Sequence, residues 1–237
     1  MPLSAAADHI QMDVNEIRHL AQRGEIESAQ RGGELYVDHE SLDGWAQLNI
    51  ISAPESKAHK MHKALSDKFR REKREVPEAW RLFRPEAVDL HISAKAKAGI
   101  VRDMTDLADA SGLLYDPDAL FRGVMEREEL ASTAIGPGVA FLHPKCHDPY
   151  IFEESFVAYG RSDRMIFFGA PDGAGTRHFF LVCSTDHEKH LHILSRLAVL
   201  AHGTCLVERL DAVEDAESAI EAIRECEREY YEKHLVF

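Results

Sequence analysis

The chain has little cysteine and no long apolar stretch. Only four of its 237 residues are cysteines, none in a CxxC pair, which argues against a disulfide framework and favours a reducing compartment. No apolar run approaches the ~20 residues that a membrane helix needs. The N-terminus MPLSAAADHIQMD has no basic segment followed by a long apolar one, unlike a secretory signal. We therefore expect a cytoplasmic protein without membrane insertion, and not a permease or a secreted protein.

Positive charge is scarce except in one segment. The chain holds 28 basic and 41 acidic residues, a formal net charge of -13. By our count the net charge is -6 over residues 1–53, +5 over 54–85 and -12 over 86–237. With 45% hydrophobic residues, the composition is that of a globular protein. We therefore predict a small domain over 1–53, a basic helical linker over 54–85 and a larger domain over 86–237.

The basic segment has a narrow apolar stripe. Met61, Leu65 and Phe69 recur every four residues, which predicts a helix, and Pro77 and Pro85 then interrupt it. Two interpretations remain open. The helix is either a solvated connector or a basic arm that contacts nucleic acid or an acidic partner.

The first fifty residues alternate helices with a hairpin. Residues 3–10 predict a short helix, and Asp13 with Glu16 forms a capping box for a second helix that Gly24 ends. The segments IESAQ and ELYVD, joined by a glycine turn, predict a hairpin. A third helix begins at Asp38 or Ser41. Its apolar residues are Leu42, Trp45 and Leu48.

This order is typical of a small winged helix-turn-helix unit. The run IRHLAQRGEIESAQRGGELYVDHESLDGWAQ resembles the excisionase-type DNA-binding domain over most of residues 3–47. The resemblance implies that the second helix presents Asn15, Arg18 and His19 to the major groove and that Arg31 lies near phosphates. The net charge of -6 departs from the pattern of such domains. A protein-docking or dimerisation module is the alternative, and residues 57–74 are a possible source of the missing positive charge.

Short apolar runs and amphipathic segments share the larger region, which predicts a layered α/β domain with a mixed sheet flanked by helices. Strands are expected at VDLHISA, VAFL, SFVAYG, RMIFFGA and HFFLVCS. Helices are expected over 95–112, 116–131, 188–203 and 215–231.

The stretch REELASTAIGPGVAFLHPK, residues 127–145, carries the most chemistry. Gly136 and Gly138 flank a proline, and VAFL ends at His143. A histidine after a strand and near glycine-rich backbone is suited to accept a group in a shallow pocket, although a structural histidine fits the same pattern.

The same stretch resembles the phosphoacceptor signature of the fructose/mannitol/nitrogen-regulatory type IIA domains of the sugar phosphotransferase system. That family reads Arg-Glu, then Ser-Thr-Gly-Ile-Gly-x-Gly-x-Ala-x-Pro-His, and later His-Leu-x-x-Leu-Ser. Here both elements occur in order, at 127–143 and 190–195, and the resemblance covers about residues 86–230. Ala134 replaces a glycine and Leu142 replaces the proline, which we expect to free the backbone before His143.

The resemblance implies a phosphohistidine relay without a cofactor. His143 would accept a phosphoryl group from a phosphorylated HPr-like carrier protein, Arg127 would bind phosphate oxygens, and His190 would donate a hydrogen bond. Further donors would line a phosphoryl loop made by Ser132, Thr133, Gly136 and Gly138. Arg127 paired with Glu126 or Glu128, and His190 as a helix cap, are the structural alternatives.

No metal site is predicted. In DHEKHLH, His187 and His190 share a helix face but His192 does not, and Cys146-His147 is expected in a loop. Three functions remain open. The chain is a regulatory IIA protein coupled to a DNA-binding module, a transcription regulator whose IIA-like domain only senses or docks, or a sugar IIA component that feeds a separate IIB protein.

Overall fold

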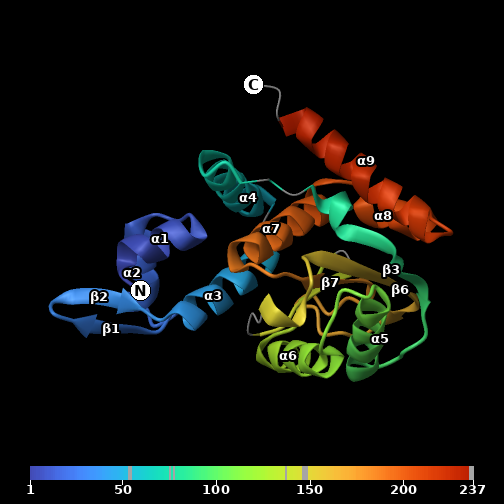
Figure 1. Cartoon of the computed structure of the whole chain (residues 1–237), viewed down its shortest axis with the longest axis horizontal. Helices are drawn as coiled ribbons and strands as arrows, with labels where there is room; N and C mark the ends of the chain where they lie inside the picture. Colours follow the sequence, from blue (N-terminus) through green and yellow to red (C-terminus); the bar gives the residue numbers. More distant parts are fainter. Residues whose placement is uncertain (53–54, 75, 77, 137, 146–148, 235–237) are drawn as a thin grey trace.

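The computed structural model describes residues 1–52, 55–74, 76, 78–136, 138–145 and 149–234. The N-terminal elements are α1 (Leu3–Ile10), α2 (Val14–Gln22), β1 (Ser28–Arg31), β2 (Glu34–Val37), α3 (His39–Ser52) and α4 (Glu55–Arg71). The α/β part comprises η1 (Ala79–Leu82), β3 (Phe83–Ile92), α5 (Lys97–Ala110), α6 (Pro117–Leu130), β4 (Ala134–Ile135), β5 (Val139–Leu142), η2 (Pro149–Ile151), β6 (Phe156–Ile166), β7 (Thr176–Cys183), α7 (His187–Gly203), α8 (Leu206–Ala212) and α9 (Ala216–His234). Figure 1 shows the hairpin at one end of the molecule and the sheet at the other.

A mixed five-stranded sheet in the order β3-β6-β7-β5-β4 forms the centre of the α/β part. The pairs β3·β6 and β5·β7 are parallel, while β6·β7 and β4·β5 are antiparallel. The predicted α/β class with a mixed sheet is confirmed. The runs SFVAYG and RMIFFGA do not form two strands, because β6 passes through the first and into the second and ends at Ile166.

Alternating side chains of the strands divide the core in two. Val139 and Phe141 of β5 pack in the cluster that contains α7 and α9, whereas Ala140 and Leu142 pack in the cluster that contains α5 and α6. The sheet is therefore buried on both faces, which explains why its strands read as continuous apolar runs instead of alternating ones.

The N-terminal elements occur in the predicted order. Gly32 and Gly33 have φ of +61° and +85°, so they make the two-residue turn between β1 and β2 that a hairpin favours. Asp13 caps α2 by accepting a hydrogen bond from the Asn15 amide at 2.8 Å. The helices and the hairpin are as expected, and their assignment to a winged helix-turn-helix domain remains a prediction.

The helix predicted in the basic segment is α4, and it is not surrounded by solvent. Its apolar stripe of Met61, Leu65 and Phe69 is buried and packs with α7. Lys68 is also buried and forms ion pairs with Asp8 at 3.0 Å and Glu188 at 2.9 Å. The interpretation as a solvated connector is thus wrong for this face, because its apolar side chains are buried. Figure 1 shows α4 beside α7. Pro77 lies outside the described residues.

Within the described part of the chain, no single helix has the length and apolar composition of a membrane span. Among the helices that the structure describes, one pair, α7 and α8, reaches that composition together, and the two helices meet at a bend of 83°.

Candidate functional site

His143 directly follows β5, where the strand leaves the sheet. Its ring is buried, with Nδ1 2.8 Å from the Phe141 carbonyl oxygen. Arg127 Nε donates a hydrogen bond to His143 Nε2 over 3.1 Å. Because Nε2 accepts, the proton of the neutral ring lies on Nδ1 and is donated to Phe141. The lone pair of Nε2 therefore faces the Arg127 guanidinium.

The surroundings keep His143 neutral. Burial, joined by the positive charge of Arg127 and opposed by the hydrogen bond to Phe141, lowers the pKa of His143 to about 3. A neutral imidazole with its Nε2 lone pair unprotonated is a competent nucleophile at neutral pH.

Arg127 lies in the last turn of α6 and is itself buried. Its Nη1 donates to the Ala131 carbonyl oxygen at 2.8 Å, which fixes the guanidinium while Nε is directed at His143. Burial lowers the pKa of Arg127, and the charge of Glu128 opposes that shift. The side chain thus presents a fixed cation beside the reactive nitrogen.

Glu128, the next residue, points elsewhere, because neighbours in a helix lie on different faces. Its carboxylate pairs with Lys97 of α5 at 2.9 Å and accepts hydrogen bonds from the amide and hydroxyl of Thr133, the former at 2.9 Å. The alternative in which Arg127 pairs with Glu128 does not describe this geometry. Glu128 instead holds the end of α6 to α5 and to the segment before β4.

His190 lies in the first turns of α7, next to His143. The two rings meet edge to face with centroids 5.3 Å apart. Asp186 caps this helix by accepting from the Lys189 amide at 2.7 Å, so His190 itself is not the side-chain cap. The two motifs of the sequence, 47 residues apart, therefore meet at one place.

The phosphoryl loop is the part of the expected site that the structure contradicts. Gly136 and Gly138 belong to the turn between β4 and β5, at the opposite end of β5 from His143. Five residues of strand span about 16 Å, so the backbone amides of Gly136 and Gly138 do not reach His143. Ser132 and Thr133, by contrast, lie near the His143 end of β5, because the Thr133 carbonyl oxygen accepts a hydrogen bond from the Phe141 amide. Their hydroxyls, however, donate to the Phe168 carbonyl and to Glu128.

Leu142 does not loosen the backbone as expected. It lies within β5, paired with Leu181 of β7, and its side chain is buried. The strand pairing supplies the restraint that a proline would otherwise give. Pro144 follows His143, and Gly123 of α6 lies so close that an added Cβ would be 3.0 Å from the Pro144 Cβ.

The histidines of DHEKHLH point to different neighbours. His187 meets Asp43 of α3, His190 meets His143, and His192 hydrogen-bonds Ser66 of α4 at 3.0 Å. The three therefore do not share a ligand centre. Cys146 and His147 lie outside the described residues.

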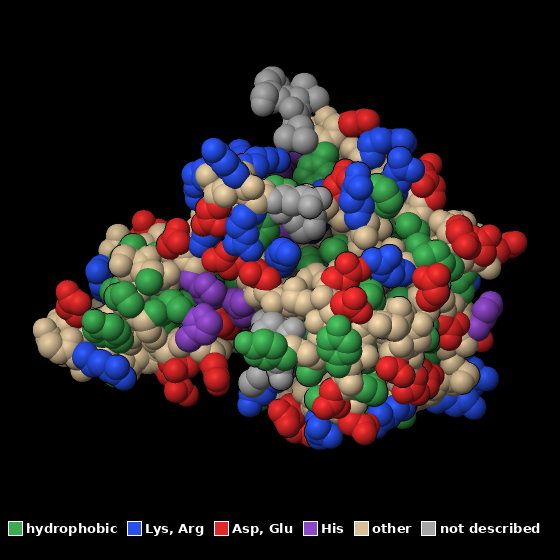
Figure 2. Space-filling model, viewed as in Figure 1, with side chains coloured by type: hydrophobic (Ala, Val, Ile, Leu, Met, Phe, Trp, Pro, Cys, Tyr) green, Lys and Arg blue, Asp and Glu red, His purple; other side chains and the backbone are tan. Residues whose placement is uncertain are grey.

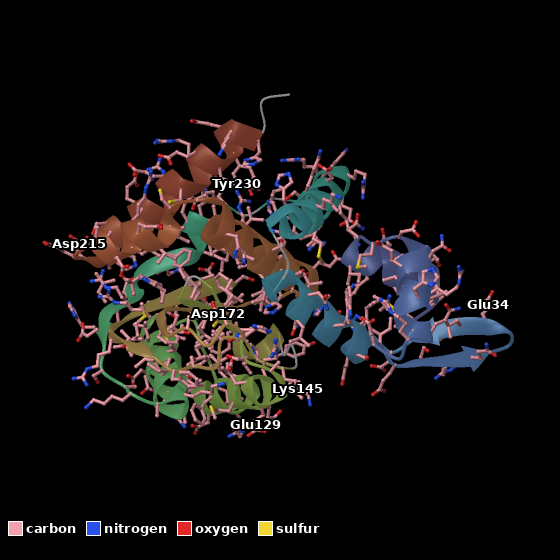
Figure 3. The ribbon with its side chains drawn as sticks, turned by 180° about the vertical axis from the view of Figure 1, so that it is seen from behind. Glu34, Glu129, Lys145, Asp172, Asp215 and Tyr230 are labelled. Carbon is pink, nitrogen blue, oxygen red and sulfur yellow. The ribbon has the colours of Figure 1, made fainter. Side chains whose placement is uncertain are left out.

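The residues expected to read DNA lie on the N-terminal elements. Asn15, Arg18 and His19 are exposed on α2, and Arg31 ends β1. Arg18 Nη1 donates to Asn15 Oδ1 at 2.6 Å. In Figure 3, Glu34 marks the hairpin at one end of the molecule, and Glu129 and Lys145 lie on the sheet-containing part.

Known proteins resemble the α/β part. The family model described as "Phosphoenolpyruvate-dependent sugar phosphotransferase system, EIIA 2" matches residues 81–226. The chain is 27% identical over 146 residues to the fructose-specific EIIABC component of Bacillus subtilis, covering 61% of this chain but only 22% of that protein. It is 29% identical over 140 residues to a nitrogen regulatory protein of Bradyrhizobium diazoefficiens, covering 58% of this chain and 88% of that one.

Solved structures agree on the fold. The nitrogen regulatory protein IIA-Ntr of Neisseria meningitidis superposes with a TM-score of 0.51 at 23% identity, over 61% of this chain and 97% of that one. Enzyme IIA-mannitol of Escherichia coli, in its complex with phosphorylated enzyme IIB-mannitol, gives 0.53 at 16% identity, over 60% of this chain and 97% of that one.

Proposed function

Since the chain belongs to the EIIA 2 family of the phosphoenolpyruvate-dependent sugar phosphotransferase system, we propose that it carries a phosphoryl group on His143 Nε2. The observation that supports this most is the Arg127–His143 pair, in which a buried cation lies 3.1 Å from the unprotonated ring nitrogen. Phosphoryl transfer depends chiefly on position and on charge stabilisation, and this pair supplies both.

The donor in this proposal is a phosphohistidine on an HPr-like carrier protein. Nε2 of His143 forms a bond to phosphorus as the nitrogen–phosphorus bond of the carrier breaks, and the carrier imidazole leaves with its electron pair. Arg127 moves from His143 to the phosphoryl oxygens, where a guanidinium binds in a bidentate manner. His190 is positioned as a second donor beside the new group. No cofactor takes part.

Docking of the carrier has to accompany this step, because the His143 side chain is fully buried in the structure. Two large apolar side chains nearby are exposed. Leu130, the last residue of α6 and three residues after Arg127, is 61% exposed. Phe167 is 80% exposed, and the carbonyl of the next residue, Phe168, accepts a hydrogen bond from Ser132. We assign the carrier's contact surface to these side chains.

The recipient is either a separate IIB protein or a regulatory target. The mannitol relative whose complex with a phosphorylated IIB protein is solved favours the former, and the nitrogen regulatory relatives favour the latter. A cytoplasmic setting follows from a soluble carrier as the donor.

Intact-mass spectrometry tests the relay. The full chain is incubated with phosphoenolpyruvate, the first enzyme of the phosphotransferase system and HPr. We expect one acid-labile phosphoryl group on the wild type and none on His143→Ala. His91→Gln, which changes an exposed histidine paired with Asp163, should behave as the wild type. If the wild type gains no mass from a competent carrier, or His143→Ala still does, the proposal is wrong.

A second proposal concerns the N-terminal elements, which we propose contact DNA through α2 and the hairpin. The observation that favours it is the exposed group of Asn15, Arg18 and His19 on one helix, beside a hairpin that carries Arg31. Exposed basic side chains on α4 add positive charge, namely Lys60, Lys63, Arg70 and Arg71. Retention on a DNA column at low salt, reduced by Arg18→Ala, would support it. Absence of retention at low salt would leave the docking or dimerisation alternative.

A further inference from the structure

Three histidines gather around one carboxylate where the N-terminal elements meet α7. His9 comes from α1, His187 is the first residue of α7, and both place Nε2 near Asp43 Oδ1, at 2.8 and 2.7 Å. His39, on α3 with Asp43, places Nδ1 3.4 Å from Asp43 Oδ2. Figure 2 shows histidine side chains together at this junction.

The carboxylate at the centre of the cluster is buried without a permanent cation. The side chain of Asp43 is 10% exposed, and among the described residues its ion-pair contacts are these three histidines, with no lysine or arginine. A buried carboxylate is costly unless it is paired or bound to a metal. Neighbouring cations are already engaged, since Lys68 pairs with Asp8 and Glu188.

We propose that His9, His39, His187 and Asp43 bind one divalent transition-metal ion of the zinc class. Three imidazoles and a carboxylate form a four-ligand set that suits a tetrahedral zinc ion. The ligand atoms of His9, His39 and Asp43 all lie within 4.8 Å of one another. The ring centroid of His187 lies 4.9 Å from that of His9 and 5.6 Å from that of His39, which places the fourth ligand beside the other three. Zinc–ligand bonds of about 2.0–2.2 Å separate tetrahedral ligands by ~3.3 Å, so binding would draw the four side chains around the ion.

The placement of the ligands gives the site a structural consequence. His39 and Asp43 are four residues apart, so one face of α3 supplies two ligands. The other two come from α1 and α7. A bound ion would therefore join the N-terminal elements to the helix that carries His190. The ring of His187 lies 6.5 Å from that of His190, centroid to centroid, in the turn next to the His143 site.

Zinc binding to the full-length, reduced protein tests the site. Equilibrium dialysis against Zn²⁺ with metal analysis should give one ion per chain. Asp43→Asn and His187→Gln should each weaken binding by at least ~10-fold, the loss that even an outer-shell change produces. His91→Gln, which changes an exposed histidine outside the cluster, should bind zinc as the wild type does. Zinc should also raise the melting temperature of the wild type more than that of either variant. Equal affinity in wild type and variants would overturn the proposal.

Cobalt provides a measurement that needs no variant. Co²⁺ in the wild type should show the visible absorption of tetrahedral coordination by nitrogen and oxygen. A thiolate charge-transfer band would instead assign the ion to a cysteine, such as the exposed Cys205, and would overturn the proposal. A spectrum of hydrated, octahedral cobalt at protein excess would also overturn the proposal. The three histidines and Asp43 would then form a hydrogen-bonded cluster without a metal. None of these readings depends on phosphorylation, so failure of the metal site is separable from failure of the relay.

Discussion

At the scale of single residues, the site depends on which atom each polar side chain reaches. Arg127 and Glu128 are adjacent in sequence, yet one contacts His143 and the other contacts Lys97 and Thr133. The residue types were predictable from the motif. Their partners were not, because they depend on the helix face that meets the strand. The Glu128–Lys97 ion pair beside the site was therefore identified only from the structure.

Arg127→Lys should slow phosphorylation of His143 by about 10²–10³-fold, the usual loss when one preorganised donor is removed. Lysine keeps the charge but loses both the planar Nε donor and the second hydrogen bond, to Ala131. The rate of mass gain at saturating phosphorylated carrier measures this. Arg122→Lys, an exposed position on the same helix, is the control and should keep the wild-type rate. An unchanged rate in Arg127→Lys would contradict the assigned role.

At the scale of elements, the exposed end of α6 is where a carrier is expected to bind. Leu130→Glu should raise the carrier concentration needed for half-maximal phosphorylation by about tenfold, as loss of an apolar interface anchor of 1–2 kcal/mol would. The maximal rate should stay near that of the wild type, because the Leu130 side chain is exposed whereas the His143 side chain is buried. Tyr115→Glu, an exposed apolar residue just before the other end of α6, should leave both quantities unchanged. Similar losses in both variants would argue for a general charge effect.

Packing of α4 on α7 yields a stability prediction. Phe69 is fully buried, with its ring centroid 5.2 Å from that of His192 and 4.4 Å from the guanidinium carbon of Arg74. Phe69→Ala should lower the free energy of unfolding by about 3–5 kcal/mol, because it removes a buried ring and leaves a cavity. Lys63→Ala, on the exposed face of the same helix, should change it by less than ~0.5 kcal/mol. Chemical denaturation measures both. A small effect of Phe69→Ala would indicate that α4 does not stabilise the fold.

At the scale of the whole molecule, buried neutral histidines make stability depend on pH. Burial, reinforced by nearby arginines, lowers the pKa values of His143 and His192 to about 3. Between about pH 3 and about pH 6.5 the unfolded chain binds these protons and the folded chain does not. The free energy of unfolding should therefore fall as the pH is lowered from about 6.5, by up to ~1.4 kcal/mol per pH unit for each histidine. The loss should be complete near pH 3.

Denaturation of the wild type and of His143→Gln between about pH 4.5 and about pH 7 measures this dependence. On acidification the free energy of unfolding of the variant should fall less steeply than that of the wild type. The difference in slope should correspond to one bound proton. His91→Gln, which removes an exposed histidine, should keep the wild-type slope. Identical slopes in wild type and His143→Gln would mean that His143 is not held neutral by its surroundings.

The amino-acid sequence by itself determined the α/β class, most element positions, the histidine after β5 and the two motifs that meet there. These are local features, set by periodicity, capping and residue type, and they depend little on the rest of the fold. Only the tertiary structure decided that Gly136 and Gly138 lie at the far end of β5, that α4 packs on α7, and that His9, His39 and His187 surround Asp43. Each of these depends on which distant segments become neighbours, and that is fixed by the burial of apolar faces summed over the whole chain.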